Sequence, residues 1–312
     1  MAPSISRYSS LEAALHHTGC RALFLDAYGV FWAGGAAGAF PGAQETMERL
    51  FASGMPIGIV SNSTQPGKNE VSKYAKHGFI QGKHYHFLVT SGDVAKSLFS
   101  SDALPFPTPH KKYALFCPPH PKFSSPACLF EGSPFTETAD LAEADFIYLN
   151  IPHIDGEDQE EADCFRALVA SFIPSQKPMV CANPDLSAHE GKPPRLVVRQ
   201  GTIASLYKEM GGSVCYIGKP STQMFSFAFE HMKLLFSVPK ELILMVGDTP
   251  ETDIRGARAF GIHSALITNT GIMADRISKS GHTALEALPP TDLPDLFIER
   301  FATYDISTSP SP

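Results

Sequence analysis

The chain has 312 residues, a formal net charge of -7, 43% apolar residues and 18% charged residues. This composition favours a folded protein over a disordered one, and the acidic balance argues against the basic face that nucleic-acid binding needs. No stretch approaches the ~18 consecutive apolar residues of a membrane span. Residues 1–19 also lack the apolar segment of a signal peptide. We therefore expect a cytoplasmic protein that binds neither a membrane nor nucleic acid.

Short apolar runs alternate with helix-like segments along the first hundred residues. The predicted strands are 22–25, 57–60 and 87–89, and the predicted helices are 43–53 and 69–77. Short buried strands that alternate with helices are typical of a parallel sheet covered by helices on both faces. The sequence therefore predicts an α/β fold.

A second region follows the proline-rich stretch 104–109, which we interpret as a linker. The region has its own predicted strands at 113–117, 146–149, 179–181 and 196–198, and a predicted helix at 160–172. At about 100 residues it can bury a separate core. We predict an α/β domain at 109–212, inserted into a core domain that consists of 1–108 and 213–312.

The core pattern is expected to resume at Val214. Predicted strands at 214–217, 242–246 and 265–267 alternate with predicted helices at 221–236 and 253–260. The run 242–246 is continuously apolar, which is typical of a central strand in a parallel sheet.

Four of the predicted strands end at a polar residue of a reactive type. Asp26 follows the first strand, Ser61 and Asn62 follow the second, Lys219 follows the run at 214–217, and Asp248 follows the run at 242–246, with Asp253 five residues later. Ligands of open parallel sheets bind outside the carboxyl ends of the strands, so these groups are expected to meet in one crevice. Each residue alone would also suit an ordinary helix cap or turn.

These residue types suit phosphoryl chemistry on a metal. Asp26 and Asp248 offer the hard oxygen ligands that Mg²⁺ prefers, and one carboxylate can attack phosphorus to form an aspartyl-phosphate. Ser61, Asn62 and Lys219 can hold the phosphoryl oxygens, and Lys219 would neutralise the charge that develops there.

Four segments resemble the motifs of the haloacid dehalogenase (HAD) superfamily of phosphohydrolases. They are Asp26–Val30, Ser61–Asn62, Gly218–Pro220 and Gly247–Asp253. The resemblance implies a Rossmann-like parallel-sheet core.

Further segments are similar to subfamily IIA, which includes the p-nitrophenyl-phosphatase-like and sugar-phosphatase-like proteins. Phe40–Ala43, followed by a helix that ends at Gly54, is one of them. That subfamily carries a large α/β cap between its second and third motifs, where 109–212 lies. Asn183 and Asp185 then match the cap loop that faces the substrate.

The resemblance also implies residue roles. Asp26 would be the nucleophile and a Mg²⁺ ligand, with the Tyr28 carbonyl, Asp248 and Asp253 completing the metal site. Lys219 would act in catalysis and bind the phosphate together with Ser61 and Asn62. The substrate would be a small phosphorylated metabolite, and an exposed apolar cap face could support a homodimer.

The sequence departs from the family pattern at Tyr28. HAD phosphatases usually carry a second Asp there, which protonates the leaving group and later activates water. A phenol with an unperturbed pKa of ~10 is a poor general acid or base near neutral pH, and such catalysis is typically worth ~10²–10⁴-fold. We predict weak hydrolysis of alkyl phosphates and better hydrolysis of aryl or acyl phosphates.

Two other functions stay open. Loss of the acid–base residue is compatible with a protein that binds a phosphorylated metabolite with little turnover. Tyr at this position also resembles the 2-haloacid dehalogenases, in which the Asp attacks carbon. Dehalogenases work without a metal and carry a smaller helical cap, whereas this chain keeps Asp248 and Asp253.

Arg195 and Arg199 follow the predicted cap loop. They could meet an anionic substrate, but we interpret them as solvated surface charges.

Overall fold

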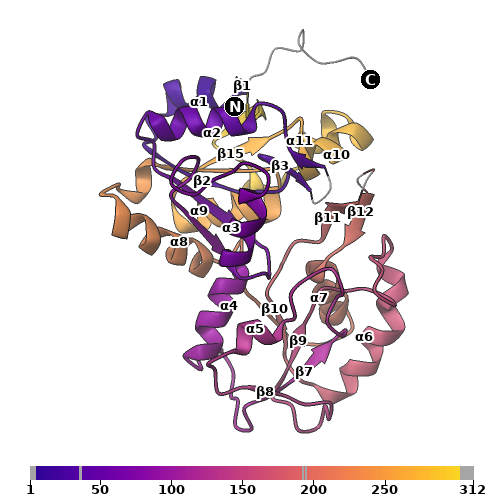
Figure 1. Ribbon diagram of the computed structural model, residues 1–312. Coiled ribbons are helices and arrows are strands. Elements are labelled where there is room, and N and C mark those ends of the chain that lie inside the picture. The colour runs from indigo at the N-terminus through magenta and orange to yellow at the C-terminus, as the bar shows by residue number, and fades with distance from the viewer. Residues whose placement is uncertain (1–4, 35–36, 192, 194, 303–312) are drawn as a thin grey trace. The chain divides into compact units, whose positions relative to one another are not determined.

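The computed structural model describes residues 5–34, 37–191, 193 and 195–302 (Figure 1). The chain divides into two compact units. The first comprises the described parts of Met1–Val60, Val71–Leu88 and Ala228–Pro312, and the second comprises Ser61–Glu70 and Val89–Phe227. Within the described residues, none of the helices is long and apolar enough to cross a bilayer.

A seven-stranded sheet in the order β1-β16-β15-β14-β2-β5-β6 organises the first unit. Its strands are β1 (Ser6–Ser10), β2 (Ala22–Leu25), β5 (Ile57–Ser61), β6 (Phe87–Thr90), β14 (Ile243–Gly247), β15 (His263–Ile267) and β16 (Leu296–Arg300). The pairings of β2, β14, β15 and β16 with their neighbours are parallel. Strand β14 is the fourth of the seven and therefore lies in the middle of the sheet. All of its residues are buried. The predicted α/β parallel sheet and its central strand are therefore confirmed.

Helices cover both faces of this sheet, as side-chain alternation along β15 shows. Ala265 and Ile267 pack in a cluster with residues of α1 (Leu11–Thr18) and α2 (Ala43–Ala52). Leu266 packs instead with residues of α10 (Gly271–Ser280) and α11 (Thr283–Glu286). Because successive side chains of a strand point to opposite faces, the two clusters are the cores of opposite faces.

The remaining elements of the first unit are either short or have residues in both units. The hairpin β3 (Trp32–Gly34) and β4 (Gly38–Ala39) follows β2, and a π-helical turn at Pro250–Ile254 precedes α9 (Arg255–Phe260). The predicted helix at 253–260 thus begins as this wider turn. The helices α3 (Gly67–Ala75) and α8 (Thr222–Leu235) each have residues in both units.

A separate five-stranded sheet, in the order β13-β10-β9-β7-β8, organises the second unit. Its strands are β7 (Lys112–Phe116), β8 (Thr136–Glu137), β9 (Phe146–Leu149), β10 (Met179–Cys181) and β13 (Val214–Tyr216). The unit also contains α4 (Ser91–Ser100), α5 (Ala127–Phe130), α6 (Arg166–Phe172), α7 (Gln200–Glu209) and the antiparallel hairpin of β11 (Ser187–Glu190) and β12 (Arg195–Val198). A second parallel α/β unit is consistent with an inserted cap.

One predicted strand belongs to the other sheet. We expected the run at 214–217 to resume the main sheet, but β13 pairs in parallel with β10, with Cys215 opposite Val180. The amide of Ile217 continues this pairing by donating to the Cys181 carbonyl at 2.8 Å. A run of four apolar residues fits either sheet equally well, so its composition could not decide the partner.

Candidate functional site

Three carboxylates gather in the first unit. Asp26 directly follows β2, Asp248 directly follows β14, and Asp253 lies in the turn before α9. One oxygen from each lies within 4.8 Å of the others. The strand pairing brings them together, because Val246 pairs with Leu25 and the Asp26 amide donates to the Val246 carbonyl at 2.9 Å. The set offers the oxygen donors that a divalent cation requires.

Asp248 is held in a tight backbone cradle. Its Oδ2 accepts the Ile272 amide at 2.7 Å, and its Oδ1 accepts the Thr249 hydroxyl at 2.9 Å. A Cβ added to Gly29 would lie 2.0 Å from Oδ2, and one added to Gly271 would lie 1.9 Å from it. Both glycines have a positive φ, so any other residue would be strained as well as too large there.

The pKa of Asp248 is raised well above its usual range. Burial is the main cause, and the charges of Asp26 and Asp253 add to it. The hydrogen bonds from Ile272 and Thr249 act in the opposite direction. A bound cation would remove the repulsion among the three carboxylates, so the cluster is electrostatically suited to a metal ion.

Asp253 shapes the loop that presents Asp248. Its Oδ2 accepts the main-chain amides of Asp248 and Thr249, each at 3.1 Å. A Cβ on Gly247 would lie 2.2 Å from the Asp253 carboxyl carbon, so this close approach requires a glycine. One Asp253 oxygen is therefore committed to the backbone, which gives this residue a structural role besides any metal contact.

A second constellation lies within the second unit and joins Asn62 to Lys219 and Asp185. Asn62 Oδ1 accepts the Lys219 amide at 2.7 Å. Asn62 Nδ2 donates to Asp185 Oδ1 at 2.9 Å and to the Lys219 carbonyl at 3.1 Å. Both amide hydrogens are thus used, so the Asn62 side chain serves to fix the Lys219 backbone.

The neighbours of this constellation are also ordered. Ser61 is buried, and its hydroxyl accepts the Ser63 amide at 3.3 Å. The Asn183 side chain accepts the Asp185 amide at 2.9 Å, which closes the turn of the predicted cap loop. Lys219 is 1% exposed. The structure thus brings Asn62, Lys219, Asp185 and Asn183 together within one unit.

Tyr28 contacts a lysine that sequence reasoning missed. Lys73 of α3 places its Nζ 3.4 Å from the Tyr28 hydroxyl and 5.3 Å from the centre of the Tyr28 ring. Nothing in the sequence pattern connects residues 28 and 73. The cradle residues Gly271 and Ile272 were missed as well.

Arg199 has a buried structural role, so its interpretation as a solvated charge was wrong. It is 4% exposed, and its guanidinium binds Asp158 Oδ1 at 2.8 Å and Glu190 Oε1 at 2.9 Å. The Arg195 side chain is about half exposed and pairs with Glu160 at 3.1 Å, as a solvated residue would. The two arginines lie at opposite ends of β12 and differ in their burial and in their partners.

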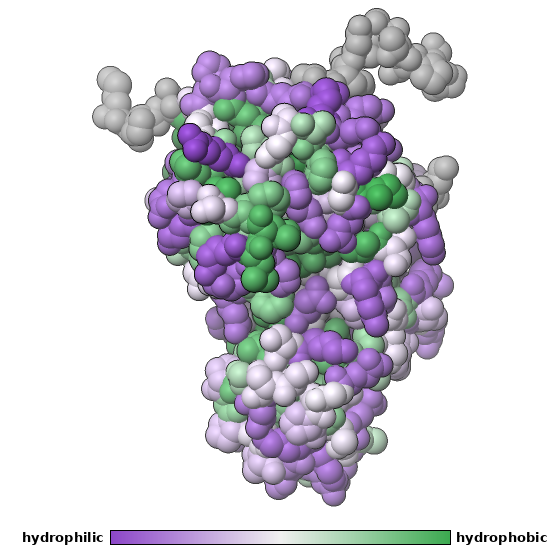
Figure 2. Space-filling model, turned by 60° about the vertical axis from the view of Figure 1, so that its left-hand side comes forward, coloured by the Kyte–Doolittle hydropathy of each residue, from purple (hydrophilic) through white to green (hydrophobic). Residues whose placement is uncertain are grey.

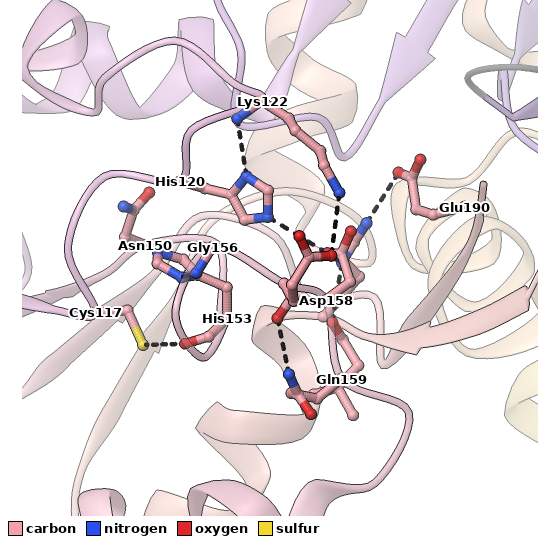
Figure 3. A network of polar contacts seen from close by, with 12 residues as sticks. Cys117, His120, Lys122, Asn150, His153, Gly156, Asp158, Gln159 and Glu190 are labelled. Carbon is pink, nitrogen blue, oxygen red and sulfur yellow. Dashed lines mark hydrogen bonds and ion pairs between the residues drawn. The ribbon is translucent and has the colours of Figure 1, made fainter.

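The same network contains a neutral histidine. His120 Nδ1 accepts the Lys122 amide at 3.1 Å, so its proton is on Nε2, which lies 3.7 Å from Asp158 Oδ1 (Figure 3). Burial lowers the pKa of His120, and the charge of Asp158 opposes that shift. The network ties the loops at 117–122 and 150–159 to the β11–β12 hairpin.

Several large apolar side chains are exposed among the described residues of the second unit. They are Ile154, Leu168, Leu186 and Tyr216. On the face drawn in Figure 2, apolar residues lie among hydrophilic ones. The homodimer through the cap therefore stays a prediction.

Two family models match the parts of the chain that contain the four motif-like segments named in the sequence analysis. A family model described as haloacid dehalogenase-like hydrolase matches residues 23–119, and a model described as HAD-hydrolase-like matches residues 216–299. A search of curated proteins gave no match.

Solved structures share the fold. A hydrolase of the haloacid dehalogenase-like family from Brucella suis 1330 is 24% identical, with a TM-score of 0.74 over 94% of this chain and 99% of that one. A possible sugar phosphatase of the HAD superfamily from Cytophaga hutchinsonii is 21% identical, with a TM-score of 0.71 over 96% and 99%. A glycerol phosphate phosphatase from Mycobacterium tuberculosis, solved with magnesium, is 18% identical, with a TM-score of 0.62 over 91% and 75%.

Proposed function

This chain belongs to the haloacid dehalogenase-like hydrolases, and from that premise we propose that it is a phosphohydrolase acting on a small phosphorylated metabolite through Asp26. The observation that carries the proposal is the cluster of Asp26, Asp248 and Asp253. The phosphatase names of two proteins with the same fold support the same reaction.

The donor set of the cluster fits Mg²⁺. Asp26, Asp248, Asp253 and the Tyr28 carbonyl would hold the ion, since Mg²⁺ prefers a few carboxylates together with water and substrate oxygens. When bound, the ion would neutralise charge on the phosphoryl oxygens. Burial raises the pKa of Asp248, and repulsion from Asp26 and Asp253 raises it further; a cation at this place would offset that repulsion.

The reaction would proceed in two displacements. An Asp26 oxygen attacks phosphorus, the bond to the leaving oxygen breaks, and an aspartyl-phosphate forms. Water then attacks that phosphorus, which releases phosphate and regenerates the carboxylate. Ser61 and Lys219 would bind the phosphoryl oxygens, and the Asn62 side chain would hold the Lys219 backbone in place.

Substrate contacts in the cap loop are part of the proposal. Asp185 is anchored by Asn62, and Asn183 shapes the turn around it. We assign this loop to the recognition of the part of the substrate that leaves.

A phosphatase assay tests the proposal. Hydrolysis of p-nitrophenyl phosphate should require added Mg²⁺, should cease with EDTA, and should fall by at least ~10³-fold in Asp26→Asn. An exposed surface variant, Lys76→Met, serves as a control for protein handling. Turnover that persists in Asp26→Asn would refute the nucleophile.

The two alternatives make different predictions in the same experiment. A metabolite-binding protein would bind phosphate esters in calorimetry without Asp26-dependent turnover. A dehalogenase would release halide from 2-haloacids in the presence of EDTA.

A further inference from the structure

The contact between Tyr28 and Lys73 lies on the loop that carries the proposed nucleophile. Lys73 Nζ donates to the Tyr28 hydroxyl at 3.4 Å and also lies 4.7 Å from the centre of the Tyr74 ring. Cation–π contacts of this kind attract an ammonium to the face of the ring. The Tyr28 hydroxyl thus accepts a hydrogen bond from an ammonium group that also contacts the neighbouring Tyr74 ring.

The backbone holds Tyr28 between two members of the acidic cluster. Asp26 lies two residues before it, and Gly29 directly after it approaches Asp248 so closely that a Cβ would lie 2.0 Å from Oδ2. The amide of Gly29 donates to the Trp32 carbonyl at 2.9 Å, and a bridge joins Tyr28 to Trp32. This turn fixes the start of the Tyr28 side chain near the proposed site of reaction.

Aromatic packing fixes the lysine relative to the same loop. Tyr74, the residue after Lys73, is buried and packs edge-on against Phe31 at 5.5 Å and Trp32 at 5.3 Å between ring centres. The segment of α3 that carries Lys73 is therefore bound to the loop that carries Tyr28. The packing within the first unit therefore holds Tyr28 and Lys73 in contact.

We infer that Tyr28 donates a hydrogen bond to the leaving oxygen and that Lys73 strengthens this bond by polarising the hydroxyl, an inference that rests on the phosphohydrolase function proposed above. As the Asp26–phosphorus bond forms, the phosphorus–oxygen bond breaks and its electron pair stays on the leaving oxygen. Tyr28 keeps its proton throughout. The leaving group departs as an oxyanion and takes a proton from water after release.

The arrangement selects a substrate class. A hydrogen bond next to a cation stabilises a departing anion but does not protonate it. Aryl and acyl phosphates, whose leaving oxygens are weak bases, are therefore the preferred substrates. In this account Tyr28 is a catalytic residue and Lys73 is a positioning residue that acts through it.

Leaving-group dependence tests the inference. Rates on p-nitrophenyl phosphate and on phenyl phosphate are measured for the wild type, Tyr28→Phe and Lys73→Met. Because the hydrogen bond matters most when the leaving oxygen carries most charge, each variant should lose roughly 10–100-fold on phenyl phosphate and less than roughly threefold on p-nitrophenyl phosphate. The double variant should be no worse than Tyr28→Phe, since both changes remove one interaction.

Controls separate this role from packing. Lys73→Arg retains a cationic donor and should restore part of the phenyl phosphate rate, whereas Lys76→Met removes an exposed charge nearby and should leave both rates unchanged. Equal losses on the two esters, or no loss in Tyr28→Phe, would overturn the inference and leave the phosphatase intact. Absence of Asp26-dependent hydrolysis in the wild type would overturn the proposed function as well.

Discussion

The glycine cradle around Asp248 leads to a sharp prediction for Gly271→Ala. The new Cβ would lie 1.9 Å from Asp248 Oδ2, where ordinary contact needs at least 3.4 Å, so the carboxylate or the loop must move by about 1.5 Å. The clashing oxygen is the one that accepts the Ile272 amide at 2.7 Å. The change therefore breaks the hydrogen bond that orients the carboxylate.

The expected loss in the free energy of unfolding of Gly271→Ala has two parts. Losing a hydrogen bond to a charged group costs about 1.5–3 kcal/mol. Alanine in the left-handed region costs about 1–2 kcal/mol more, and Gly271 has a φ of +70°. We expect Gly271→Ala to lower the free energy of unfolding by roughly 2.5–5 kcal/mol and to weaken Mg²⁺ binding by roughly 10–100-fold.

Gly19→Ala is the matched control. Gly19 has a φ of +66° and caps α1, and no atom lies within 4 Å of an added Cβ. It should cost only the backbone term of about 1–2 kcal/mol and leave Mg²⁺ binding unchanged. Urea denaturation in EDTA and calorimetric titration with MgCl₂ measure both quantities. Equal stability losses in the two variants, with normal Mg²⁺ affinity in Gly271→Ala, would refute the claim that Gly271 is needed to position the Asp248 carboxylate.

Three more predictions concern the buried polar groups. Asn62→Ala removes two hydrogen bonds to the Lys219 backbone and one to Asp185, and it should cost about 2–4 kcal/mol in urea denaturation and slow p-nitrophenyl phosphate turnover; an unchanged turnover would contradict the role of this side chain. Because the pKa of Asp248 is raised, the folded metal-free protein keeps a proton that the unfolded chain releases, so its free energy of unfolding should fall as pH rises above roughly 4. Asp248→Asn should flatten this decline, and a slope unchanged in that variant would exclude Asp248 as its source. Arg199→Met removes the guanidinium that pairs with buried Asp158 and with half-buried Glu190 and should cost roughly 3–5 kcal/mol, whereas the exposed Arg195→Met should cost about 0–1 kcal/mol; equal losses would refute the distinction.

The sequence was sufficient to predict the parallel sheet and the acidic residues at the ends of its strands. The runs before Asp26 and Asp248 are continuously apolar, which is how a strand buried on both faces reads. Local composition also located the helix α2 to within a residue of its end.

Other features depend on partners distant in sequence. The edge strand β1 and its neighbour β16 were not predicted, because SRYSS and LFIER carry little apolar periodicity of their own. The sheet membership of β13 depends on β10, and the contact of Tyr28 with Lys73 depends on the packing of α3. No local pattern encodes such pairings, and burial of Arg199 follows only from the folded network.

The strand order also determines when the seven-stranded sheet can be completed during synthesis of the chain. Strand β2 is flanked by β5 on one side and by β14 on the other, and β14 is translated more than two hundred residues later. Until then the nascent sheet presents an open, apolar edge, which is the kind of surface that chaperones protect from aggregation. The early strand β1 must wait longer still, because its partner β16 is made last.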